Sequence, residues 1–91
     1  MPKYELEDLR VSLNNIDSAL VCMLAERFHV TSKISQVKSE LGLPPVDKIR
    51  ELELFQRIEQ QAEHGGLDPG FAKRIFRIIV DEVVEHHRRH S

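Results

Sequence analysis

Residues 6–41 read LEDLRVSLNNIDSALVCMLAERFHVTSKISQVKSEL, and apolar side chains recur along them at alternating steps of three and four. This heptad spacing continues for five repeats without glycine or proline, which predicts one long helix from about Glu5 to Leu41. At ~1.5 Å per residue, such a helix is on the order of 50 Å long. A chain of 91 residues cannot cover that length by itself, so we expect a second copy of the chain to contribute. We call these positions the seam: Leu6, Leu9, Leu13, Ile16, Leu20, Met23, Arg27, Val30, Ile34, Val37 and Leu41.

Two shorter helices are predicted after the seam. Gly42 and the pair Pro44–Pro45 stop the first helix, and Asp47 is a good N-cap for the second. The predicted apolar face of the second helix is Ile49, Leu52, Phe55, Ile58 and Ala62. Gly65–Gly66 ends it, and Asp68–Pro69, a cap residue followed by proline, begins the third. The apolar residues of the third helix are Phe71, Ile75, Phe76, Ile79, Val80, Val83 and Val84. No strand-like alternation is found, so the expected fold class is all-α, in one domain over residues 1–91.

Composition excludes several classes of function. The formal net charge is −2, which gives no electrostatic reason to expect nucleic acid or a membrane surface as partner. The N-terminal residues MPKYELEDLR are charged and contain no apolar run typical of a signal peptide or a membrane span. Cys22 is the single cysteine, so no disulfide framework is possible within the chain. We therefore expect a cytoplasmic protein stabilised by oligomerisation.

Three cations on the first predicted helix suggest an anion-binding site. Arg27 occupies a seam position, and an unpaired buried guanidinium is too costly to keep, so a carboxylate or an anionic ligand must meet it. Lys38 lies eleven residues later and points to within about 20° of the same helix face. Arg10 lies seventeen residues before Arg27, or ~25 Å along the helix. It cannot share a small ligand with Lys38 of the same chain, although a second protomer could bring it there.

These residues carry a resemblance to a known family. The run LxxLRVSLNNIDSALVCMLAER at residues 6–27, Lys38 eleven residues later, and PVDKIRELE at residues 45–53 resemble the all-helical (type II) chorismate mutases. The resemblance extends from about Leu6 to His87 and implies a three-helix protomer, intertwined with a second copy into a homodimer that has two equivalent sites. It implies the isomerisation of chorismate to prephenate, in phenylalanine and tyrosine biosynthesis, without cofactor or metal.

The resemblance also assigns roles to residues of this chain. Arg27, with Arg10 supplied by the partner chain, is expected to bind the substrate carboxylates, and Lys38 a carboxylate and the ether oxygen. Glu51 is expected to hold the ring hydroxyl, with Asp47 and Arg50 supporting the pocket. The chemistry suits these residues, because a pericyclic shift needs only a compact substrate conformer and positive charge near the breaking C–O bond.

The third helix departs from the family pattern. The family often has serine and, four residues later, glutamine or glutamate, where this chain has Val83 and His87. Val83 cannot form the polar contact, whereas His87 can donate to the ether oxygen as neutral imidazole or as imidazolium. Either His87 replaces the amide, or it belongs to a frayed basic tail. The departure leaves open 4-amino-4-deoxychorismate or isochorismate as substrate. A non-catalytic helical dimerisation module is the alternative from another class.

Overall fold

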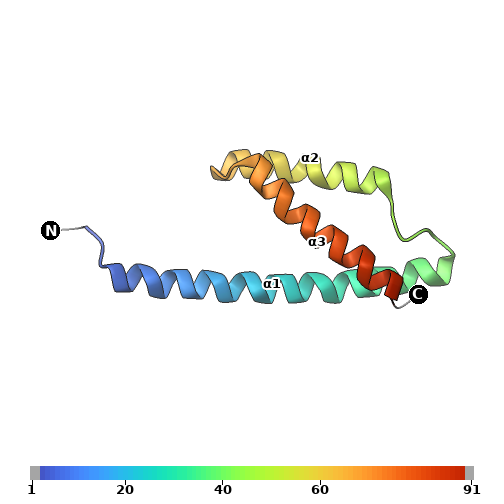
Figure 1. Cartoon of the computed structure of the whole chain (residues 1–91), viewed down its shortest axis with the longest axis horizontal. Coiled ribbons are helices and arrows are strands. Elements are labelled where there is room, and N and C mark those ends of the chain that lie inside the picture. Colours follow the sequence, from blue (N-terminus) through green and yellow to red (C-terminus); the bar gives the residue numbers. More distant parts are fainter. Residues whose placement is uncertain (1–2, 90–91) are drawn as a thin grey trace. The chain divides into compact units, whose positions relative to one another are not determined.

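The computed structural model describes residues 3–89, and within them the chain is built from three helices: α1 (Leu6–Leu41), α2 (Lys48–Gly65) and α3 (Pro69–Arg89) (Figure 1). The described chain divides into two units after Ser32. The first unit contains most of α1. The second contains the last turns of α1 together with α2 and α3, and it holds most of the candidate site. The predicted all-α class, with one long helix and two shorter ones, is confirmed.

Local signals in the sequence set the helix boundaries. Gly42 adopts a positive φ of 69° directly after α1, a conformation that glycine reaches without steric cost. The Asp47 side chain accepts from the Arg50 backbone N–H at 3.1 Å and so caps α2. Gly66, with φ of 74°, ends α2. Asp68 accepts from the Phe71 N–H at 3.0 Å ahead of Pro69, the first residue of α3.

The buried core of the second unit lies between α2 and α3, which pack against each other (Figure 1). Its buried residues are Leu54, Ile58, Ala62, Ala72 and Val80, and Ile79 of α3 is also buried. The predicted apolar face of α2 is wrong in part. Ile49 and Leu52 are 72% and 60% exposed in the single chain, whereas Leu54 is buried. The buried positions follow a step of four residues, Leu54, Ile58 and Ala62, and α3 lies on that side of the helix.

The seam on α1 is exposed among the residues that the structure describes. The helix has no buried residue, and its apolar seam side chains range from 46% exposed at Val30 to 69% at Met23. A single folded chain rarely leaves an apolar stripe of this length in water. No helix in residues 3–89 combines the length and the apolar composition needed to cross a membrane.

Candidate active site

Lys38 lies beside the segment that leads into α2. Its side chain is half-buried, and Nζ donates to the Pro45 carbonyl oxygen at 3.4 Å. Leu43 N–H donates to the Lys38 carbonyl at 2.8 Å, which closes the end of α1 and turns the chain toward α2. Pro45 is two residues before Asp47, so the end of α1 places the ammonium near the start of α2. The long Lys38–Pro45 contact is weak enough to be exchanged for an anionic ligand.

His87 contacts α1 rather than extending into water. It is half-buried, and its Nδ1 forms a hydrogen bond with the Ser35 hydroxyl of α1. Ser35 precedes Lys38 by three residues, and residues at that spacing are neighbours on a helix surface. The end of α3 is therefore held against the part of α1 that carries Lys38. Val83 lies one turn earlier on α3 and is also half-buried.

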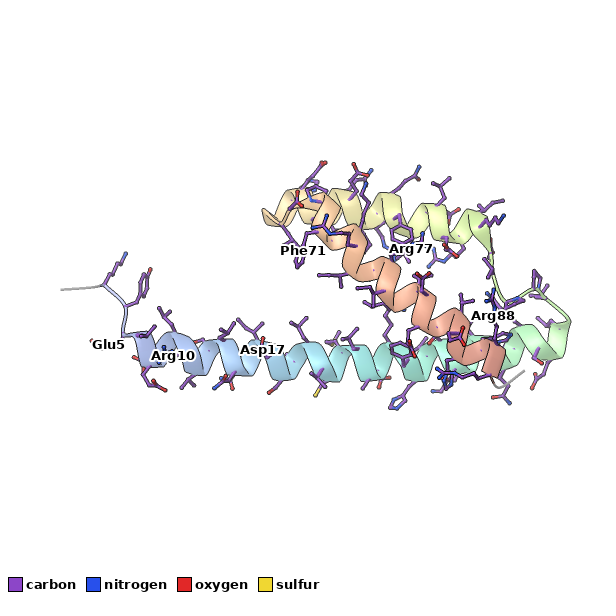
Figure 2. All side chains as sticks on the ribbon, in the orientation of Figure 1. Glu5, Arg10, Asp17, Phe71, Arg77 and Arg88 are labelled. Atoms are coloured by element: carbon purple, nitrogen blue, oxygen red, sulfur yellow. The ribbon has the colours of Figure 1, made fainter. Side chains whose placement is uncertain are left out.

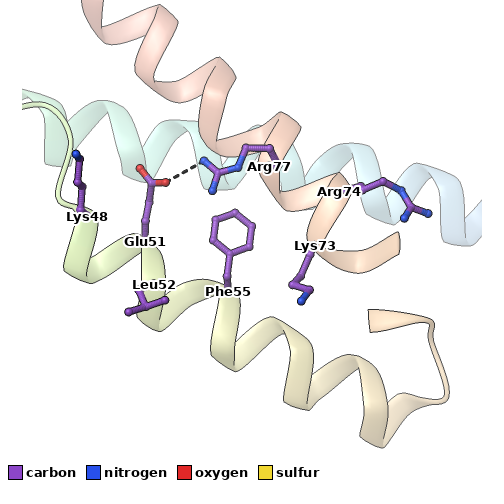
Figure 3. Close-up of a pocket in the computed structure, with 7 residues that line it drawn as sticks. All are labelled: Lys48, Glu51, Leu52, Phe55, Lys73, Arg74 and Arg77. Carbon is purple, nitrogen blue, oxygen red and sulfur yellow. Dashed lines mark hydrogen bonds and ion pairs between the residues drawn. The ribbon is translucent and has the colours of Figure 1, made fainter. Parts of the chain in front are cut away.

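Glu51 of α2 forms an ion pair with Arg77, a residue that was not predicted from the sequence. Arg77 Nη1 donates to Glu51 Oε1 at 2.9 Å, and the side chains are 49% and 25% exposed, respectively (Figure 3). The guanidinium carbon of Arg77 lies 4.4 Å from the centroid of the Phe55 ring, and Nη1 also donates to Asp81 at 3.5 Å. The pKa of Arg77 is raised above its ordinary value, chiefly because Glu51 accepts its hydrogen bond. Arg77 therefore remains charged at any pH at which the protein functions.

An open pocket of about 530 Å³ surrounds this ion pair between α2 and α3 (Figure 3). Four basic side chains and one acidic side chain contribute to its wall, together with two apolar ones. The lining residues are Lys48, Glu51, Leu52, Phe55, Lys73, Arg74 and Arg77. Lys73 is paired with Glu59 at 3.3 Å, which reduces the positive charge that a ligand would meet there.

The remaining candidate residues are Arg10, Arg27 and Arg50. Arg10 and Arg27 belong to the first unit. Arg10 is exposed (Figure 2) and lies 3.9 Å from Glu7, whereas Arg27 is half-buried. Arg50, in the first turn of α2, is exposed and pairs with Glu53 at 3.6 Å. Within the second unit, hydrogen bonds thus join Lys38 to the segment that leads into α2, and join the neighbouring Ser35 to His87.

Sequence reasoning missed Ser35 and Arg77. The signal for Ser35 was present, since it lies one helical turn from Lys38 and is a short polar residue beside the seam. Arg77 had no such signal, because its contact with Glu51 joins residues 26 positions apart and depends on how α2 and α3 pair. Figure 2 shows Arg77 on the side of α3 that faces α2. Within residues 3–89, no three His, Cys, Asp or Glu side chains are grouped so as to hold a metal ion.

These features define an all-α protein with basic side chains grouped around a candidate site for an anionic small molecule. Comparison with known families identifies the class further: the family described as chorismate mutase type II matches residues 9–88. The chain therefore belongs to the type II chorismate mutases, which are isomerases. The predictions of this family, of an isomerase and of chorismate mutase function are confirmed.

Individual relatives agree with this assignment. The chain is 26% identical to the chorismate mutase of Methanocaldococcus jannaschii over 77 residues, which cover 85% of this chain and 78% of the relative. It is 31% identical to the T-protein of Enterobacter agglomerans, over 86% of this chain but only 21% of that longer protein. It is also 28% identical to the 4-amino-4-deoxychorismate mutase of Streptomyces venezuelae, over 87% of this chain and 77% of the relative.

Proposed function

We propose that the chain converts chorismate to prephenate in a cationic pocket shared by two copies of the chain. The observation that carries this proposal is the position of Lys38, between the segment that enters α2 and the Ser35–His87 contact of α3. In the reaction one C–O bond breaks and one C–C bond forms within the same molecule, and no proton, electron or group is exchanged with the protein. The side chains need only bind, fold and polarise the substrate.

Each side chain then has one task. Arg27 and the partner's Arg10 bind the two carboxylates and hold the substrate in a compact conformer. Lys38 faces the ether oxygen, where negative charge grows as the C–O bond breaks, so its effect is larger in the transition state than in the ground state. Glu51 accepts from the ring hydroxyl. Asp47 caps α2, and Arg50 lies in the following turn, so both keep the start of α2 in place.

The exposed seam supports the homodimer. Apolar side chains along the whole length of α1 are open to water in the single chain. A second copy carries a seam of the same pattern and length. Packing the two copies together would bury the apolar side chains of both seams. The same arrangement supplies Arg10 in trans, since ~25 Å of helix separates it from Arg27. We also propose that residues 1–91 form a single domain and that the reaction takes place in the cytoplasm.

The function is tested by following the loss of chorismate absorbance with purified protein and identifying prephenate as the product. The assay is repeated with 4-amino-4-deoxychorismate and isochorismate. We expect saturable turnover of chorismate without added metal or cofactor. No turnover of any of the three compounds would contradict the proposal and favour a helical dimerisation module.

His87 is proposed as the donor to the ether oxygen in place of the amide, and its contact with Ser35 supports an ordered rather than a frayed position. Replacing His87 with alanine should lower kcat about tenfold or more, because a donor to a charged group is lost. His87→Gln restores a donor and should keep most of the activity. His86→Ala, on the neighbouring residue, is the control and should change kcat less than about twofold. Equal effects at positions 86 and 87 would refute this role.

A further inference from the structure

Arg77 is held in one place by three groups. Its guanidinium lies over the face of Phe55, donates to Glu51 at 2.9 Å and reaches Asp81 at 3.5 Å (Figure 3). An arginine stacked on an aromatic ring loses less freedom on pairing than an unrestrained one. The pair with Glu51 joins α2 to α3, whereas Asp81 lies one turn along α3 and is 65% exposed. Glu51 is therefore the principal partner of the Arg77 charge.

This pairing changes what Glu51 presents to a ligand. The ion pair occupies one carboxylate oxygen, Oε1, so Oε2 can accept a hydrogen bond from a ligand. The negative charge of the carboxylate is largely compensated by the adjacent guanidinium. A neutral donor such as a hydroxyl loses little from that compensation. An ammonium group loses the attraction of a free carboxylate and is also repelled by the guanidinium of Arg77.

We propose that Arg77 is a specificity-determining residue that favours a substrate bearing a ring hydroxyl over the analogue bearing a ring amine. The inference rests on the proposed function, in which Glu51 holds the substituent at that ring position. Chorismate carries a hydroxyl there, and 4-amino-4-deoxychorismate carries an amine, which is protonated at neutral pH like other aliphatic amines. The two substrates are otherwise alike, so the discrimination arises at Glu51 and Arg77.

The other basic residues near Glu51 have partners of their own. Arg50, one residue before Glu51, is paired with Glu53 at 3.6 Å. Lys73, on the wall of the same pocket, is paired with Glu59. Arg74 lies over the Phe71 ring at 5.9 Å, and its side chain points away from Glu51 (Figure 3). Of the four basic side chains that line the pocket, Arg77 is the one that forms the 2.9 Å ion pair with Glu51.

The test measures kcat/KM for both substrates with the full chain and compares their ratio between variants. Arg77→Gln removes the charge but keeps an amide donor for Glu51, and we expect the ratio of amine to hydroxyl substrate to rise about tenfold or more. Arg77→Lys keeps the charge and should restore most of the preference. Arg74→Gln removes the same charge one turn away and should change the ratio less than about twofold.

The variant Glu51→Gln provides a second, independent test of the substrate preference. It leaves the guanidinium uncompensated, so the amine substrate should lose more turnover than chorismate, and the ratio should move in the opposite direction. Thermal unfolding of each variant shows whether the fold is retained. Equal ratios in wild type, Arg77→Gln and Glu51→Gln, with chorismate still turned over, would overturn the inference and leave the proposed function standing. Turnover of neither substrate by the wild-type chain would overturn both.

Discussion

Replacing Lys38 with alanine is expected to lower kcat/KM for chorismate by roughly 10²–10³-fold, the loss typical of removing one donor from a developing negative charge. The side chain is half-buried and forms a long 3.4 Å hydrogen bond to the Pro45 carbonyl, so its charge is available to a ligand. Part of the loss should appear in kcat, because the ether oxygen gains charge only as the C–O bond breaks. The measurement is steady-state kinetics at constant salt and pH.

Lys33→Ala is the matched control, because it removes an exposed lysine from the same helix and the same unit. It should leave kcat/KM within about twofold of wild type. Lys38→Arg tests whether positive charge alone is sufficient, since it keeps the charge but places it on a bulkier, planar group. An effect of Lys38→Ala no larger than that of Lys33→Ala would show that Lys38 does not act on the substrate.

Most of the fold could be predicted because its boundaries are set by local chemistry. Asp47, Gly66 and the pair Asp68–Pro69 act within one helical turn of themselves, so sequence alone places the helix ends. Which face of α2 would be buried could not be predicted equally well. Leu52 and Leu54 are chemically alike, and only the direction from which α3 approaches decides that Leu54 is covered.

The candidate site divides in the same way. Arg27 could be selected because a guanidinium on an apolar seam requires an anionic partner, and Lys38 and Arg10 could be selected from their spacing to Arg27 along the helix. The partners of Glu51 and His87 lie on other helices, at Arg77 and Ser35, and depend on tertiary packing. Spacing in the sequence predicts which side chains are neighbours on one helix. It does not predict that α2 and α3 pack so that Glu51 meets Arg77.

The shared site makes a quantitative prediction for mixed dimers. Arg10→Ala and Lys38→Ala should each be nearly inactive alone, because every site then lacks one cation. When equal amounts are unfolded together and refolded, half of the dimers contain one copy of each variant. One of the two sites in such a dimer has both Lys38 and the partner's Arg10 intact, and the other has neither. Random association therefore restores about a quarter of the wild-type activity.

Mixing Arg27→Ala with Lys38→Ala provides the matched control. These two residues are proposed to serve the same site from the same chain, so no mixed dimer contains an intact site. The mixture should retain only the mean of the two residual activities. Refolded wild type measures the yield of the procedure, and size-exclusion chromatography checks that each mixture is dimeric.

The central claim is that two copies of the chain build each active site, and the refolded mixture of Arg10→Ala and Lys38→Ala tests it most directly. Recovery of about one quarter of the activity of refolded wild type, with none in the Arg27→Ala and Lys38→Ala mixture, is the result that the shared site predicts. Activity equal to the mean of the two separate variants, in a sample that is dimeric, would contradict it.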